Sequence, residues 1–234
     1  MLCREFRIEG ARPGAPRLVT LYLPPNAYLS GRCPIVFCTD GQMVPPFATR
    51  VERDIRDGEL PAIVLVGVHS SRHRSQEYNL GQDDSKFRWH EQFFTEELPA
   101  WLHAEFGLAA DRNQTAVFGC SHGGAFALTM ASRHRDQYGL VIAFSVAGTF
   151  ETLEELQSNP QPLPRFYLSA GTREKPLLKT TRRLARHLKR YQIDHVVTER
   201  HAGHDYGYWE TELPLALKWG FAASHSGEAC DNLD

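Results

Sequence analysis

Residues Thr115 to Ala127 read TAVFGCSHGGAFA, and this stretch decides the fold that the sequence predicts. An apolar strand leads into Gly119-Cys120-Ser121-His122-Gly123, and a helix of small residues follows. A G-x-S-x-G pattern between a strand and a helix is typical of a nucleophile elbow, a tight turn that exposes the serine hydroxyl. The two outer glycines let strand and helix approach closely while the serine takes a strained backbone conformation. We therefore predict that Ser121 is a nucleophile; an ordinary structural turn is the alternative.

Outward from this elbow, short β-branched runs alternate with segments of helical periodicity. This alternation predicts an α/β fold with a mostly parallel sheet of about eight strands, flanked by helices. We expect strands at Arg4–Ile8, Arg17–Leu23, Ile35–Cys38, Ile63–Val68, Thr115–Phe118, Leu140–Ser145, Phe166–Ser169 and His195–Thr198. We expect helices at Phe93–Glu105, His122–Arg135, Pro176–Tyr191 and Trp209–Phe221. The basic face of the third helix is interpreted as a solvated surface, with an acidic partner as the alternative.

Three polar segments do not fit this alternation. Ser70 to Phe87 follows a strand and is expected to be an irregular loop, the kind of segment that carries functional residues on a rigid scaffold. Glu151 to Pro164 is short, so any lid over a site should be minimal. We predict one domain over residues 1–222 and a disordered tail over residues 223–234.

The composition excludes several classes of protein. The 234 residues carry 26 Lys plus Arg against 28 Asp plus Glu, and 42% of them are hydrophobic, so neither disorder nor nucleic-acid binding is expected. The longest apolar runs span about 8 residues, too few to cross a membrane, and the N-terminus does not resemble a signal peptide. The five cysteines show no metal-ligand spacing. We expect a cytoplasmic protein without metal or cofactor, whose partner is a small molecule; the oligomeric state is open.

Two segments further along the chain supply partners for a serine nucleophile. In enzymes with this elbow the catalytic groups follow the chain order Ser, then Asp or Glu, then His. Glu174 follows the next-to-last predicted strand, and His204 follows the last one. Since ligands bind at the carboxyl ends of parallel strands, both side chains should lie beside Ser121. We predict Glu174 as the acid and His204 as the base; the other candidates are the histidines His69, His122 and His201 and the carboxylates Asp194 and Asp205.

A tetrahedral intermediate needs amide donors for its oxyanion. One is the backbone N–H of His122, which follows the nucleophile and opens a helix. The other is expected from Thr39-Asp40-Gly41-Gln42-Met43, where the glycine lets the N–H of Gln42 turn into the site. An ordinary turn would explain the same Asp-Gly pair.

Arginine and aromatic residues near the same sheet edge predict a pocket for an anionic or aromatic group, or else a solvated loop over core aromatics. The predicted substrate-binding residues are Met43, Arg74, Tyr206 and Trp209. Cys38 and Cys120 should end neighbouring strands as packing residues, with oxidation sensitivity of Cys120 as the alternative.

Over nearly its whole length the chain resembles the esterase family of α/β-hydrolases that includes esterase D, the mycolyltransferase antigens and the enterochelin esterases. The resemblance rests on the elbow and on VFCTDGQM (36–43), RSQEY (74–78), FFTEELPAWL (93–102), AGTREKP (170–176) and GHDYGYW (203–209). It implies an α/β-hydrolase fold and ester hydrolysis, with Glu174 as the acid and Gln42 and His122 as the oxyanion amides. The enterochelin esterase branch is the most similar, and it implies an aromatic or siderophore-type ester.

The sequence thus predicts a serine carboxylic ester hydrolase that works through an acyl-enzyme. Two other classes stay open. An acyltransferase or a peptidase could use the same three residues, and a non-catalytic α/β-hydrolase could serve as a binding protein.

Overall fold

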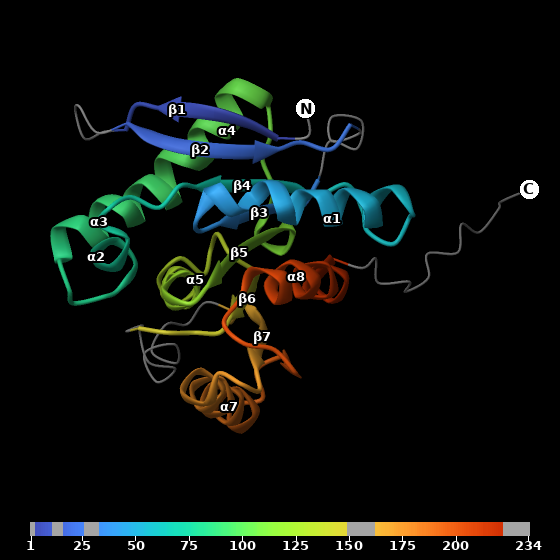
Figure 1. The fold of residues 1–234 in the computed structure, drawn as a ribbon. Coiled ribbons are helices and arrows are strands. Elements are labelled where there is room, and N and C mark those ends of the chain that lie inside the picture. The colour runs from blue at the N-terminus through green and yellow to red at the C-terminus, as the bar shows by residue number, and fades with distance from the viewer. Residues whose placement is uncertain (1–2, 11–15, 26–32, 149–161, 222–234) are drawn as a thin grey trace, which may run out of the picture.

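One sheet of eight strands runs through the part of the chain that the structure describes (Figure 1). The computed structural model describes residues 3–10, 16–25, 33–148 and 162–221. The strands are β1 (Cys3–Ile8), β2 (Arg17–Tyr22), β3 (Ile35–Cys38), β4 (Val64–Val68), β5 (Thr115–Cys120), β6 (Leu140–Phe144), β7 (Arg165–Gly171) and β8 (His195–Arg200). Their order is β1-β2-β4-β3-β5-β6-β7-β8, and only the β1–β2 and β2–β4 pairs are antiparallel. The strands from β4 to β8 are parallel, so the loops after them meet at one edge.

Helices cover both faces of the sheet (Figure 1). They are α1 (Val44–Arg56), α2 (Arg74–Tyr78), α3 (Asp84–Gln92), α4 (Leu98–Phe106), α5 (His122–Arg133), α7 (Lys175–Arg190) and α8 (Tyr206–Phe221). Three single turns accompany them: η1 (Gly41–Met43), η2 (Phe93–Glu97) and η3 (Arg112–Gln114). Buried side chains of α1 and α8 share one core cluster, whereas those of α3, α4, α5 and α7 belong to the other.

Alternation along the strands divides their side chains between these two cores. In β3, Ile35 and Phe37 pack into the core on the α5 side, and Val36 and Cys38 pack into the core on the α1 side. Successive side chains of a strand point to opposite faces, so a central strand covered on both faces must be apolar throughout. The structure thereby confirms the α/β fold and the mostly parallel sheet that the sequence predicts.

The largest departure from the sequence prediction lies between residues 44 and 92. The predicted loop from Ser70 to Phe87 is wrong in part, because it contains α2 and the first turn of α3. Asp83 caps α3 by accepting a hydrogen bond from the N–H of Lys86, at 3.1 Å. Helix α1 was not predicted; Pro45 and Pro46 stand in its first turn, where the missing N–H groups cost nothing.

Two sequence predictions fall outside the described residues. They are the tail over residues 223–234 and, except for residues 162–164, the segment in which a minimal lid was expected. No helix in the described ranges has the length and apolar character that a membrane crossing requires.

Candidate active site

The elbow has the strained geometry that its sequence predicts. Ser121 lies between β5 and α5 with φ 58° and ψ −125°, a backbone conformation that residues other than glycine rarely adopt. A Cβ atom built on Gly119 would stand 2.1 Å from the carbonyl oxygen of Gly123, so Gly119 cannot carry a side chain while strand and helix stay this close. A Cβ atom on Gly123 would stand 2.2 Å from Oγ1 of Thr39. The N–H of Ser121 donates to Phe144, at 2.9 Å, and its carbonyl accepts from Ala147, at 3.1 Å, which fixes the turn against β6.

Glu174 and His204 contact each other at the same sheet edge. The carboxylate of Glu174 is buried, with 3% of its side chain exposed, and its Oε1 bonds to Nδ1 of His204. Its second oxygen accepts from the Ser145 hydroxyl, at 2.7 Å, and from the N–H of Gly171, at 2.8 Å. Three hydrogen bonds therefore hold this carboxylate, and the ring of His204 is left with Nε2 for another partner.

The other candidate acids and bases are placed differently. His201 lies in the same loop as His204, but its side chain is exposed. The carboxylate of Glu174 bonds to His204 and not to His201. Asp205 accepts from the N–H of Tyr208, at 3.0 Å, in the first turn of α8. Asp194 precedes β8, so it lies at the opposite, amino edge of the parallel strands.

His69 and His122 also belong to other contacts. His69 pairs through Nε2 with the hydroxyl of Thr20, at 2.7 Å, and His122 is the first residue of α5. Burial first, and then the positive charge of Arg74, lower the pKa of His122.

Two aromatic residues of α8 complete this side of the site. The indole N–H of Trp209 donates to the Ser145 hydroxyl, at 3.0 Å, while its ring meets the His204 ring edge-on with centroids 4.8 Å apart. Tyr206 is 58% exposed and packs against Trp209 at 5.4 Å. A chain of contacts thus runs from Trp209 through Ser145 and Glu174 to His204.

The segments that carry Gln42 and His122 are neighbours because β3 and β5 pair in parallel. The N–H of Thr39 continues that pairing to the carbonyl of Phe118, at 3.0 Å. Gln42 lies in the single turn η1, and His122 opens α5. The first N–H groups of a helix have no acceptor within it, so both positions can offer donors to a ligand.

The turn at Gln42 is tightly held. A Cβ atom on Gly41 would stand 2.1 Å from the carbonyl oxygen of Gly67 in β4, so this residue must be glycine. The amide side chain of Gln42 donates to the Ser70 hydroxyl, at 2.7 Å, and accepts from the N–H of Ser70, at 3.2 Å. Met43 ends the turn and packs, partly buried, against the core on the α1 side.

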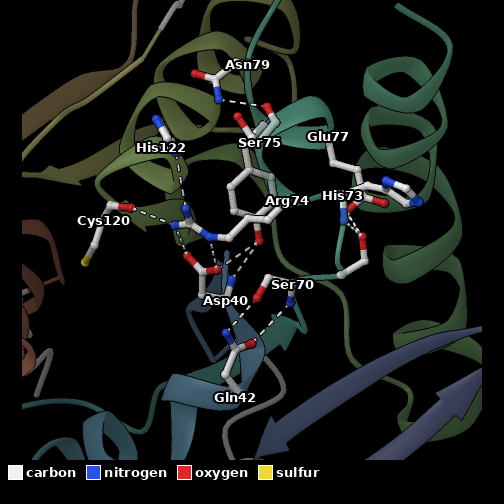
Figure 2. Close-up of polar contacts among 12 residues, drawn as sticks. Asp40, Gln42, Ser70, His73, Arg74, Ser75, Glu77, Asn79, Cys120 and His122 are labelled. Atoms are coloured by element: carbon white, nitrogen blue, oxygen red, sulfur yellow. Dashed lines mark hydrogen bonds and ion pairs between the residues drawn. The ribbon is translucent and has the colours of Figure 1, made fainter. Parts of the chain in front are cut away.

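Arg74 lies on α2 and faces both the segment before Gln42 and the elbow segment around His122 (Figure 2). Its Nε and Nη2 donate to the two carboxylate oxygens of Asp40, at 2.6 and 2.7 Å. Burial disfavours the Arg74 cation, but the hydrogen bonds and the charge of Asp40 outweigh that effect, so the pKa of Arg74 is raised. This guanidinium is thus mainly occupied by Asp40, and its predicted contact with substrate stays a prediction.

Cys38 and Cys120 end the neighbouring strands β3 and β5, as predicted, and both are buried free thiols. Burial raises the pKa of Cys120 well above its usual value, and the negative charge of Asp40 adds to this effect. A thiol held in its protonated form is a poor nucleophile, which favours the packing role.

Within the described ranges, no three His, Cys, Asp or Glu side chains are grouped so that they could hold a metal ion.

A groove of about 760 Å³ lies beside the Gln42 turn. Ser70 connects the two, since it lines the groove and bonds to Gln42. Other residues of its wall are Arg17, His69, Arg72, His73 and Trp89. Arg72 and Trp89 are exposed, so a cation and an aromatic ring face this hollow together.

Sequence reasoning missed Ser145, Tyr78 and the role of Asp40. Ser145 is fully buried and follows an apolar strand, as Ser121 does, so its position at a strand end was the available signal. The hydroxyl of Tyr78 accepts from the N–H of Asp40, at 3.0 Å. Nothing in the sequence around Tyr78 indicates that contact, because the two residues lie on different elements.

The sequence matches the model of a protein family described as "Putative esterase" over residues 10–219. The chain belongs to this esterase family. No curated protein matches it. Solved structures match nearly the whole chain, but at sequence identities below 25%. At such identities the match shows a shared fold.

Three solved structures illustrate this likeness. The enterochelin esterase from Shigella flexneri superposes with a TM-score of 0.79 and 19% identity, over 94% of this chain and 58% of that protein. The BES protein from Bacillus cereus gives 0.79 and 15% identity, over 94% and 95% of the two chains. The S-formylglutathione hydrolase from Staphylococcus aureus gives 0.72 and 13% identity, over 93% and 98%. The chain spans just over half the length of the Shigella enzyme.

Proposed function

We propose that the protein is a serine carboxylic ester hydrolase with Ser121, His204 and Glu174 as its triad. The observation that carries this proposal is the buried Glu174 carboxylate, which bonds to His204 at the sheet edge where the strained Ser121 turn lies. A carboxylate in this place fixes the imidazole tautomer and stabilises the imidazolium that forms during reaction. Membership of an esterase family supports the same reaction class.

The contacts suggest the order of the steps. With Nδ1 of His204 donating to Glu174, Nε2 takes the proton of the Ser121 hydroxyl as its oxygen attacks the ester carbonyl carbon. The N–H groups of Gln42 and His122 would bind the tetrahedral oxyanion. The imidazolium returns the proton to the departing alcohol, which leaves an acyl-enzyme. Water then attacks the acyl carbon by the same route, releasing the carboxylic acid and free Ser121.

The groove beside the Gln42 turn supports an aromatic or siderophore-type ester as substrate. Trp89 and Arg72 both line the groove, and an aromatic ring beside a cation suits an aromatic group that bears a negative charge or phenolic oxygens. Tyr206, Trp209 and Met43 would contact the substrate from the other side of the site. The enterochelin esterase from Shigella flexneri has the same fold and a name that fits this substrate class. A cytoplasmic location stays part of the proposal.

The test compares the wild type with Ser121→Ala on p-nitrophenyl acetate, p-nitrophenyl butyrate and a panel that includes catecholate esters. We expect hydrolysis by the wild type, and a loss of at least about 10³-fold in kcat in the variant, because the nucleophile is removed. A fluorophosphonate probe should label the wild type only. Equal rates for both proteins would refute the proposal. Transesterification that outpaces hydrolysis at a low concentration of added alcohol would indicate an acyltransferase.

A further inference from the structure

Asp40 joins the two segments that would form the oxyanion site. Its backbone is left-handed, with φ 54° and ψ 56°, and only 4% of the residue is exposed. A Cβ atom on Gly123 would stand 3.2 Å from its Oδ2, so the carboxylate lies against the first turn of α5. Asp40 also immediately precedes η1, and its carbonyl accepts from the N–H of Met43, at 2.8 Å. Any shift of Asp40 therefore moves the Gln42 turn relative to the helix that begins at His122.

Neither the backbone nor the charge of Asp40 is stable in this position without partners. A left-handed backbone is less favourable than the usual conformations of an L-residue, and a buried carboxylate needs a cation or several hydrogen bonds. Arg74 supplies the cation through both carboxylate oxygens, and Tyr78 accepts from the backbone N–H, at 3.0 Å. Both residues lie on α2, so this short helix holds the Asp40 turn in place.

The same guanidinium reaches the elbow (Figure 2). Nη2 of Arg74 donates to the carbonyl oxygen of Cys120, at 3.5 Å, and Nη1 lies 3.5 Å from Nδ1 of His122. Cys120 and His122 flank Ser121 on its two sides. One side chain thus contacts the turn before Gln42 and both neighbours of the nucleophile.

We propose that Arg74 is a positioning residue, which clamps Asp40 and the elbow so that the N–H groups of Gln42 and His122 converge on one oxyanion. This inference rests on the proposed function. Arg74 acts through the two backbone segments, whereas the predicted substrate contact would act on the ester directly. The two roles differ in what they change, because donors aimed at an oxyanion stabilise the transition state more than the bound ester.

The test measures kcat and KM for Arg74→Ala and Arg74→Lys on a neutral and an anionic ester of the same alcohol. We expect Arg74→Ala to lower kcat about 10- to 100-fold on both esters with little change in KM, as is usual when an orienting contact is lost. Arg74→Lys keeps the charge without the two-pronged geometry and should recover part of the loss. The inhibition constant of an arylboronic acid, whose serine adduct is tetrahedral, should rise in parallel with the fall in kcat.

Arg182→Ala is the matched control. Arg182 makes a similar two-pronged pair with Glu199, at 2.7 and 2.6 Å, on the exposed surface between α7 and β8. Its removal should leave kcat and boronic acid inhibition unchanged. Asp40→Asn combined with Arg74→Ala should be no slower than Arg74→Ala alone, since the two side chains act as one unit.

Three outcomes would overturn the clamp. They are an Arg74→Ala protein that is folded by circular dichroism and keeps the wild-type kcat, a KM increase confined to the anionic ester, and boronic acid inhibition that is unaffected. If Arg74→Ala does not fold, Arg74→Lys and Asp40→Asn give the same comparison. A wild type that neither hydrolyses an ester nor reacts with the fluorophosphonate refutes the proposed function, whereas an active wild type with fully active Arg74 variants refutes the clamp alone.

Discussion

Three residues with positive φ angles lie at the carboxyl ends of adjacent strands in the middle of the sheet. They are Asp40 after β3, Ser121 after β5 and Ser145 after β6, with φ between 49° and 58°. None of them is glycine, so each conformation costs free energy that surrounding contacts must offset. Asp40 contacts Arg74, and Ser145 contacts Glu174 and Trp209. Among the described residues, three of the four non-glycine positions with positive φ thus lie at the sheet edge that carries the proposed active site.

His90 lowers the stability of the fold for a different reason, because its polar ring is buried without hydrogen bonds among the described residues. It is fully buried among the rings of Tyr78, Phe94 and Phe126, and neither ring nitrogen has a hydrogen-bond partner in the described part of the chain. Burial, aided by the charge of Arg17, lowers its pKa well below the ordinary value. Folding therefore favours the neutral ring, while the unfolded chain takes up a proton near pH 6.5.

We predict that the free energy of unfolding falls as the pH drops below about 6.5, since the unfolded state then binds more protons than the native state. His90→Phe should weaken this dependence and raise stability at pH 7 by about 1 kcal/mol, because two orphaned polar atoms disappear. Urea unfolding at pH 5, 6 and 7 measures both effects. Parallel pH profiles for the two proteins would contradict the prediction. His69 and His122, whose pKa values are also lowered, should retain a smaller slope in the variant.

At the scale of elements, α8 contacts the residues that hold Glu174, the proposed acid. Its first turns bring Trp209 against both Ser145 and His204, the proposed base. The pairing of β6 with β7 places Ser145 near Glu174. The orientation of the Glu174 carboxylate therefore depends on how α8 packs on the sheet.

Trp209→Phe should keep the ring against His204 while removing the N–H that donates to Ser145. We expect kcat to fall about tenfold, because the Ser145 hydroxyl loses a partner that orients it toward Glu174. Steady-state kinetics on p-nitrophenyl butyrate measures the change. Trp219→Phe is the control on the same helix, since Trp219 packs on Tyr167 and Arg165 instead. Equal kcat values for the two variants would refute the orienting role of Trp209.

At the scale of the whole molecule, the two cores share every central strand of one sheet. Side chains of β3, β4, β5 and β6 enter both clusters, so neither core can lose its packing while the other keeps its strands in place. On this ground we propose that the described strands and helices form one domain; the bounds that the sequence predicts, residues 1–222, stay a prediction.

We expect one cooperative unfolding transition in urea. Circular dichroism at 222 nm reports the helices on both faces, and tryptophan fluorescence reports Trp101 on one face and Trp209 on the other. The two signals should give the same midpoint. Separate midpoints, or two steps in either signal, would show that the chain does not unfold as one unit and would contradict a single domain.

The sequence by itself determined the elbow, the α/β fold and the chain order of Ser121, Glu174 and His204. These features are local. An apolar strand, a serine between two glycines and the spacing of apolar residues along a helix can each be recognised from consecutive residues. Helices α2 and α3 escaped prediction because they are short and polar, and α2 is held largely by contacts with other elements.

Only the tertiary structure decided which side chains meet around the three predicted residues. It paired Glu174 with His204 instead of His201, placed Trp209 on Ser145, 64 residues away, and joined Arg74 to Asp40, 34 residues away. Each contact depends on the order of strands in the sheet and on how helices pack over its edge. No pattern of consecutive residues specifies the strand order. The residues that orient the site could therefore be identified only from the folded structure.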